Sequence, residues 1–219
     1  MVYDEKKVII FDLWGTLLEN GIFPSPSRQT KKIMGLFDLK FHEYIEIFEK
    51  AFMTKNFNNL KEAFDHVFKE MDVDPKDYNR EERLIGLWNK NKLFVKPYQD
   101  TTEVLEELQT KYDLVLLSNS PFYTDEILAK FDLEKYFKKI YLSYETGYLK
   151  SETQSFEMVL NDLDVKAEDC LMVGDSIESD MHGARAVDID GVLIDRRNKR
   201  EFESKVLSLT ELKDNLIEK

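Results

Sequence analysis

The pattern of apolar and polar positions changes twice along the chain. Val8–Phe11 is an unbroken run of β-branched and aromatic residues, typical of a strand buried on both faces. From about residue 25 to residue 94, apolar residues recur at helical spacing, and no strand-like alternation interrupts this block. Beyond Pro97, short apolar runs alternate with amphipathic segments. The pattern therefore predicts one strand, then a group of helices, then alternating helices and strands.

Individual elements follow from the same periodicity. Inside the block, helices are predicted at about 41–52, 60–71 and 80–92. Beyond it, helices are predicted at 101–112, 125–131, 152–163, 180–187 and 209–217, and strands at 114–117, 140–142, 170–173 and 191–194. Strands that alternate with helices are joined by crossovers, which build a parallel sheet covered on both faces. The predicted fold class is α/β, a Rossmann-like parallel sheet with helices on both faces and an inserted all-helical segment.

Composition narrows the class of protein. The chain has 219 residues, enough for one catalytic-size domain that carries a smaller insertion. A single cysteine, Cys170, excludes a disulfide framework and a cysteine-based zinc site. The net charge of −12 disfavours sequence-independent binding to nucleic acid or to an anionic membrane. No apolar run approaches the ~18 residues of a membrane span, and the first residues are polar, so a cytoplasmic protein without a secretory signal is expected.

Polar side chains follow three of the apolar strands. Asp12, Ser118 and Asp175 each stand where a predicted strand ends. Taken alone, each is more often a turn residue or a helix cap. Together they point to one edge, because ligands bind at the carboxyl ends of strands in an open parallel sheet. Asp12 and Asp175 would repel each other there unless a cation or a proton lay between them, and Mg²⁺ suits a site with few carboxylates.

Four segments, in chain order, resemble the four motifs of the haloacid dehalogenase-like hydrolase superfamily. They are Phe-Asp-Leu-Trp-Gly-Thr-Leu at 11–17, Ser118-Asn119, Lys150, and Gly-Asp-Ser-Ile-Glu-Ser-Asp at 174–180. The resemblance implies that residues 1–18 and 97–219 form the Rossmann-like core. It also implies that residues 19–96 form a helical cap domain inserted after the first motif.

The resemblance assigns the central chemistry to three positions. Asp12 would be the nucleophile that attacks the substrate and forms a covalent aspartyl intermediate. The carboxylates of Asp12 and Asp175 and the backbone carbonyl of Trp14 would hold Mg²⁺. The expected substrate is a small anionic molecule, and the expected assembly is a monomer or a homodimer.

Five further residues receive supporting roles from the same resemblance. Thr16 would position the loop, and the Ser118–Asn119 segment would donate hydrogen bonds to the transferred group. Lys150 would neutralise charge, and Asp180 would orient Lys150 or a water molecule. Outside this context, Lys150 is typical of a surface loop, and Ser118 and Asp180 are typical of a turn and a helix cap.

Position 14 departs from the family pattern. Family phosphatases usually carry a second Asp two residues after the nucleophile, which protonates the leaving alcohol, whereas this chain has Trp14. The dehalogenase branch also has an aromatic residue there, but it works without metal and carries polar, uncharged groups where Asp175 stands in this chain. The presence of Asp175 and Asp180 favours metal-assisted phosphoryl chemistry. The preferred prediction is a Mg²⁺-dependent phosphatase of a small phosphorylated metabolite. The alternatives are a metal-independent 2-haloacid dehalogenase-like hydrolase and a catalytically weak protein that binds a ligand or a partner.

Basic residues near the expected site are harder to interpret. Arg28 follows a loop close to the nucleophile in sequence, and a solvent-facing position is expected for it. The basic run 196–200 is predicted to be a solvated surface, although its loop follows a strand and would lie at the rim of the site. Neither is assigned a role.

Overall fold

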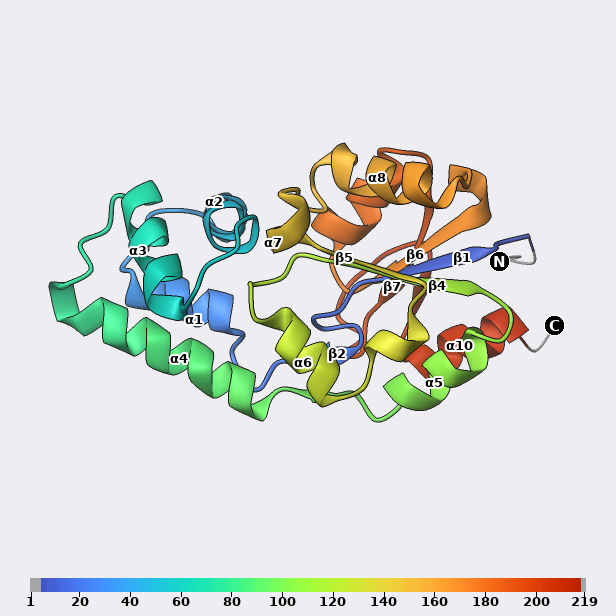
Figure 1. Cartoon of the computed structure of the whole chain (residues 1–219), viewed down its shortest axis with the longest axis horizontal. Helices are drawn as coiled ribbons and strands as arrows, with labels where there is room; N and C mark the ends of the chain where they lie inside the picture. Colours follow the sequence, from blue (N-terminus) through green and yellow to red (C-terminus); the bar gives the residue numbers. More distant parts are fainter. Residues whose placement is uncertain (1–4, 218–219) are drawn as a thin grey trace.

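A parallel β-sheet lies at the centre of the computed structural model, which describes residues 5–217 (Figure 1). Within that range the sheet has six strands in the order β5-β4-β1-β6-β7-β8, and every neighbouring pair is parallel. The strands are β1 (Val8–Phe11), β4 (Asp113–Ser118), β5 (Lys139–Leu142), β6 (Cys170–Gly174), β7 (Asp190–Ile194) and β8 (Lys205–Val206). The predicted α/β class is confirmed, and β8 is a strand that the sequence pattern did not predict.

Helices cover both faces of the sheet. Ile9 and Phe11 of β1 pack into the apolar cluster that includes α5, α6 and α10, while Val8 and Ile10 pack against α8 and α9. This alternation follows from the period of two along a strand. The covering helices are α5 (Thr101–Leu108), α6 (Thr124–Lys130), α7 (Ser143–Thr146), α8 (Thr153–Leu163), α9 (His182–Arg185) and α10 (Leu209–Ile217), with short turns η2 (Glu134–Tyr136), η3 (Ala167–Asp169) and η4 (Ile177–Met181). A helix was predicted at 180–187, whereas the observed α9 is shorter and follows the π-helical turn η4.

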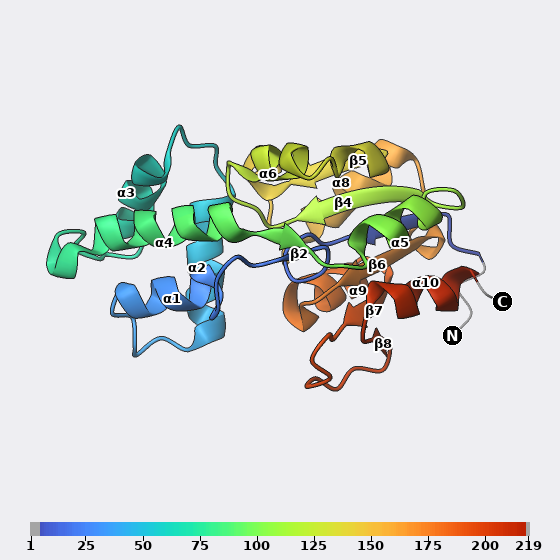
Figure 2. The ribbon, with the colours of Figure 1, turned by 90° about the horizontal axis from the view of Figure 1, so that it is seen from below.

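The helical insertion, which we define as α1 to α4, lies beyond the carboxyl ends of the strands (Figures 1 and 2). Its helices are α1 (Pro26–Ile33), α2 (Phe41–Met53), α3 (Leu60–Glu70) and α4 (Arg80–Phe94), with the turn η1 (Asp77–Asn79) before α4. Both described ends of the chain lie at the opposite end of the molecule.

Aromatic side chains form the centre of the helical insertion. On α2, the rings of Tyr44, Phe48 and Phe52 stack at centroid separations of 5.4 and 5.2 Å. Trp88 of α4 lies 4.6 Å from Phe52, and its indole nitrogen donates a hydrogen bond of 2.9 Å to the Thr30 hydroxyl on α1. Because this stack fixes the rotation of α2, it also fixes which of its polar residues face the sheet.

Two short strands connect the helical insertion to the sheet. β2 (Leu18–Glu19) enters it and β3 (Lys96–Pro97) leaves it, and the two pair in antiparallel fashion, Leu18 with Pro97 and Glu19 with Lys96. The resemblance predicts a division of the chain at 18 and 97, which stays a prediction. The small two-stranded sheet was not predicted.

Candidate active site

The carboxyl ends of β1, β4 and β6 meet at one edge of the sheet. β1 pairs with both other strands, so Asp12, Ser118 and Asp175 follow neighbouring strands. One carboxylate oxygen each from Asp12, Asp175 and Asp180 lie within 4.8 Å of one another. The convergence expected for Asp12 and Asp175 is therefore observed, and Asp180 joins them.

Two glycines allow this close approach. Gly15 has a φ of +88°, and a Cβ atom there would lie 2.6 Å from the Asp175 carboxyl group. At Gly174, a Cβ atom would lie 2.1 Å from Oδ2 of Asp180. A side chain at either position would push a carboxylate out of the cluster, since contacts this short do not occur for real Cβ atoms.

Lys150 lies inside the carboxylate cluster rather than on the surface. Lys150 is 2% exposed. Its Nζ atom forms an ion pair with Asp12 and another, at 2.5 Å, with Oδ1 of Asp180. Burial alone would lower the pKa of Lys150, but the charges of Asp12 and Asp180 outweigh it and raise the pKa above its usual range. Thr16 donates a hydrogen bond of 3.0 Å to the other Asp12 oxygen. The Asp12 carboxylate is thus held from both sides.

The cluster carries more negative than positive charge. Burial, reinforced by the charge of Asp180, raises the pKa of Asp12 to about 6 against the opposing effect of Lys150. Burial and the neighbouring carboxylates raise the pKa of Asp175 as well. The guanidinium of Arg200 lies 3.9 Å from the Asp175 carboxylate. Several hard oxygen donors with unbalanced charge fit a divalent cation such as Mg²⁺.

A chain of hydrogen bonds leads from Trp14 to Ser118. The Trp14 indole nitrogen donates to the Ser120 hydroxyl at 3.2 Å, and Ser120 donates to the Ser118 hydroxyl oxygen at 2.9 Å. Ser118 and Ser120 are both buried. Ser118 itself donates a long hydrogen bond of 3.5 Å to the Asn119 carbonyl, so its hydroxyl hydrogen can be redirected to a ligand. The role of Ser120 was not predicted, although it follows the same strand two residues later.

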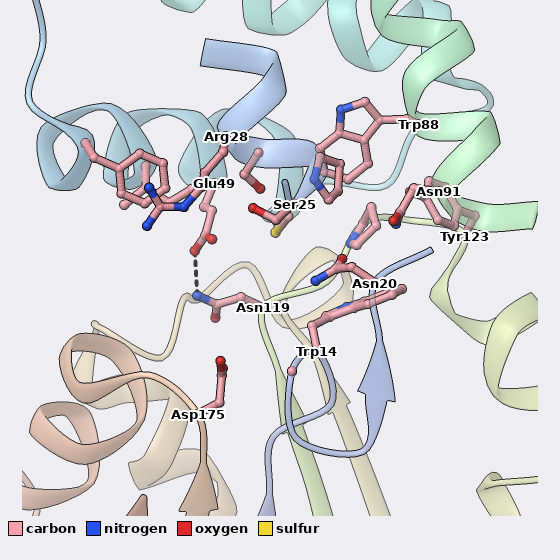
Figure 3. Close-up of a pocket in the computed structure, with 17 residues that line it drawn as sticks. Trp14, Asn20, Ser25, Arg28, Glu49, Trp88, Asn91, Asn119, Tyr123 and Asp175 are labelled. Carbon is pink, nitrogen blue, oxygen red and sulfur yellow. Dashed lines mark hydrogen bonds between the residues drawn. The ribbon is translucent and has the colours of Figure 1, made fainter. Parts of the chain in front are cut away.

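Asn119 links the sheet to the helical insertion. Its side-chain oxygen accepts a hydrogen bond of 2.8 Å from the Lys150 backbone N–H, and its side-chain nitrogen donates one of 2.9 Å to Glu49 on α2 (Figure 3). Glu49 was not among the predicted site residues. The sequence feature that could have identified Glu49 is its position next to Phe48, at the edge of the buried face of α2.

A pocket of about 260 Å³ lies between the edge of the sheet and the helical insertion (Figure 3). Trp14, Asn119 and Asp175 line it from the sheet side, and Glu49 and Asn91 line it from α2 and α4. A second cavity of about 690 Å³ opens beside Gly15 and Asp175, and its lining includes the basic residues Arg28, Arg196, Arg197, Lys199 and Arg200. Both cavities reach Asp175, so a small anionic molecule can approach the cluster.

The basic run at 196–200 is not simply a solvated surface, contrary to expectation. Arg196 forms two hydrogen bonds with Asp100, at 3.1 and 3.2 Å, and one with the Thr16 carbonyl. Arg200 donates to the Asp175 carbonyl. These contacts join the loop to the two acidic motifs. Arg28 is exposed, as expected, and its guanidinium lies 4.3 Å from the centre of the Phe41 ring.

Comparison with known proteins identifies similar sequences and folds. The family model described as haloacid dehalogenase-like hydrolase matches residues 6–188. Within residues 5–217, no helix is both long enough and apolar enough to cross a bilayer.

Named relatives include two phosphatases. The chain is 38% identical over 100 residues to a ribulose-1,5-bisphosphate 5-phosphatase of Halopiger xanaduensis, which spans 44% of this chain and 41% of that protein. It is 23% identical over 193 residues to a glyceraldehyde 3-phosphate phosphatase of Pyrococcus furiosus, which spans 83% and 77%. A crystal structure of a phosphatase of the same family from Thermococcus onnurineus matches with a TM-score of 0.63 and 25% identity, over 95% of this chain and 96% of that one.

Proposed function

Since the chain belongs to the haloacid dehalogenase-like hydrolases, we propose that it is a Mg²⁺-dependent phosphatase that cleaves a small phosphorylated metabolite through an aspartyl-phosphate on Asp12. The observation that carries this proposal is the position of Lys150, buried between Asp12 and Asp180 with Asp175 adjacent. A carboxylate that attacks an anionic phosphoryl group needs such neutralising charge close to it. The two phosphatases among the relatives support the choice of substrate class.

Asp12 acts first in the proposed reaction. One of its carboxylate oxygens attacks phosphorus, the bond to the leaving oxygen breaks, and the phosphoryl group becomes attached to Asp12. Water then attacks phosphorus, which releases inorganic phosphate and restores the carboxylate. The hydrogen bond from Thr16 and the ion pair with Lys150 hold the carboxylate in place for the attack.

Charge that develops on the phosphoryl oxygens is stabilised by neighbouring donors. The Ser118 hydroxyl accepts a hydrogen bond from Ser120 and donates only a long one of 3.5 Å to the Asn119 carbonyl, which a phosphoryl oxygen would replace. Lys150 supplies a full positive charge, and Asp180 keeps it beside Asp12. Asp12, Asp175 and the Trp14 carbonyl would hold Mg²⁺, which would add neutralising charge next to the phosphoryl group.

A panel of substrates tests this proposal against its main rival. Purified protein would be incubated with aryl phosphates, alkyl phosphates and 2-chloropropionate, with Mg²⁺ or with a chelator. We expect phosphate release that requires Mg²⁺ and no halide release. Halide release that is independent of Mg²⁺ would instead establish a dehalogenase, and absence of both activities would favour a binding protein.

Magnesium should stabilise the folded protein, because a ligand that binds only the native state raises the free energy of unfolding. At a hundredfold excess over its dissociation constant, the gain is about 2.7 kcal/mol, or roughly 5–11 °C in Tm for a chain of this size. Asp175→Asn should remove most of this shift. It should not lower the metal-free Tm, since it removes one of the mutually repelling carboxylates.

Differential scanning calorimetry with and without Mg²⁺ measures both quantities. Asp38→Asn is the matched control, because Asp38 is exposed and lies outside the cluster. An Asp175→Asn protein that keeps the full Mg²⁺ shift would contradict the proposed metal site.

A further inference from the structure

The proposed phosphatase lacks a proton donor at the position where family phosphatases carry one. Trp14 occupies it, and its indole N–H is already bonded to Ser120. An alkoxide leaving group needs a proton as its bond to phosphorus breaks. If the proposed function holds, another side chain must therefore deliver a proton into the pocket.

Glu49 is a carboxyl group placed at the pocket. It lines the same 260 Å³ space as Trp14, Asn119 and Asp175, and it enters from α2, across from the sheet (Figure 3). Its Oε2 atom accepts the Asn119 hydrogen bond, and Glu49 forms no ion pair with any other residue of the range 5–217. Asn119 in turn is fixed by the Lys150 backbone. The carboxyl group is thus held at the pocket by a neutral hydrogen-bond donor and not by an ion pair.

We propose that Glu49 is the general acid and base of this enzyme and replaces the acid absent at position 14. As the bond between phosphorus and the leaving oxygen breaks, the Glu49 carboxylic acid gives its proton to that oxygen and an alcohol leaves. The resulting Glu49 carboxylate takes a proton from water while the water oxygen attacks the phosphorus of the aspartyl-phosphate. Inorganic phosphate and the Asp12 carboxylate are released, and Glu49 is again protonated.

The charged surroundings of Glu49 favour this cycle near neutral pH. Asp12, Asp180 and Lys150 all act on Glu49 across the pocket, and Asp175 and Arg28 line the same space. Burial is the largest influence and raises the pKa of Glu49 to about 7, while Asn119 and Lys150 oppose it. A group with this pKa can both give and take a proton at physiological pH.

Glu49→Gln tests the proposal, because glutamine can still accept the Asn119 hydrogen bond but cannot transfer a proton. We expect kcat on alkyl phosphates to fall by about 10²-fold or more, and on aryl phosphates by much less, since a good leaving group needs little protonation. The dependence of kcat/KM on leaving-group pKa should steepen. The fall of alkyl kcat/KM above about pH 7 should disappear. Glu46→Gln, an exposed change on the same helix, is the matched control.

Two further variants keep the test decisive. Glu49→Asp retains a proton donor and should keep more alkyl activity than Glu49→Gln. Trp14→Asp, made in the Glu49→Gln background, should restore part of the alkyl activity, whereas Trp14→Phe should not. Equal losses on alkyl and aryl substrates, or none, would overturn the role of Glu49 while leaving the phosphatase proposal intact. Absence of phosphate release by the wild type would overturn the phosphatase proposal itself.

Unpaired polar atoms carry a second inference, about the substrate. Asn91 and Tyr123 line the pocket on the α4 side and are 1% and 3% exposed. Among residues 5–217, the Asn91 side-chain oxygen and the Tyr123 hydroxyl have no hydrogen-bond partner. A buried polar group without a partner is destabilising, so such groups are retained where a ligand satisfies them.

We infer that Asn91 and Tyr123 bind hydroxyl groups of the leaving alcohol, so that the substrate is a phosphorylated polyol or sugar. A hydroxyl group can donate to the Asn91 oxygen and exchange a hydrogen bond with Tyr123. In Figure 3 the two residues lie on the other side of the pocket from Glu49. The leaving alcohol would therefore lie between the proton donor and these hydroxyl-binding groups.

Glycerol 1-phosphate and propyl phosphate form a suitable pair of probes, because they differ only in hydroxyl groups. We expect the wild type to prefer glycerol 1-phosphate in kcat/KM, and Tyr123→Phe to reduce that preference about tenfold, the worth of one hydrogen bond. The Tm of Tyr123→Phe should be unchanged or higher, because the change removes an unpaired buried hydroxyl. Tyr78→Phe, at an exposed tyrosine, is the control.

Asn91→Leu should reduce the same preference. A wild type that does not distinguish the two probes, or a Tyr123→Phe protein that keeps the preference, would overturn this inference. A clear drop in Tm without a change in preference would show that the hydroxyl is structural.

Discussion

Asp12→Asn is expected to reduce phosphate release by about 10⁴-fold or more, the scale seen when a catalytic nucleophile is removed. The amide cannot form the acyl-phosphate bond, although it has nearly the shape of the carboxylate. The fold should survive, because Lys150 keeps its ion pair with Asp180. The Tm should be equal to that of the wild type or higher, since one carboxylate of a crowded cluster is neutralised.

Steady-state phosphate release and an acid-quench experiment with labelled substrate measure this effect. The wild type should yield protein-bound phosphate that the variant lacks, and Asp38→Asn should behave as the wild type. A folded Asp12→Asn protein with substantial activity would show that another residue is the nucleophile.

Lys150→Met is expected to impair both activity and stability. It leaves the buried carboxylates of Asp12 and Asp180 without their shared cation. Loss of one partner from a buried ion pair typically costs about 3–5 kcal/mol, which corresponds to roughly 6–20 °C in Tm. Catalysis should fall as well, because the charge that neutralises the nucleophile and the phosphoryl group is gone.

The stability loss of Lys150→Met should depend on pH in a defined direction. Without the lysine, burial holds the pKa of Asp12 even further above its unfolded value of about 3.9 than the value of about 6 in the wild type. The folded variant therefore binds more protons than the unfolded chain, so its stability falls as pH rises through this range and recovers as pH is lowered. Melting curves in chelator between pH 5 and pH 8 test this, with Lys90→Met as an exposed control. A deficit that is constant across this range would contradict the explanation.

Much of the acidic cluster could be predicted because it depends on strand order and motif order alone. Asp12 and Asp175 follow parallel strands, and parallel strands bring their carboxyl ends to the same edge. The position of Lys150 was expected only through the resemblance. By spacing alone it is indistinguishable from a surface lysine, and its burial depends on packing between β1 and η4.

The helical insertion contributes the residues that the sequence pattern could not identify. Glu49 and Asn91 carry no motif, and they line one pocket because the Phe48–Phe52–Trp88 packing fixes α2 against α4. Tyr123 also carries no motif, and it lies outside the insertion, directly before α6. The roles of Arg196 and Arg200 were hidden for a related reason. Their partners, Asp100 and the Asp175 backbone, lie far away in sequence.

The pairing of β2 with β3 has a consequence for how such a protein can evolve. The strands that lead into and out of the helical insertion are paired, with Glu19 and Lys96 separated by about 5 Å as in any antiparallel pair. The two-stranded sheet of β2 and β3 can therefore form whatever segment connects Glu19 to Lys96, from a tight turn to a long polypeptide. Segments whose ends lie this close can be exchanged with little disturbance to their host. The Asp12, Asp175 and Asp180 cluster can be inherited unchanged, while new insertions alter which molecules reach it and which acid assists it.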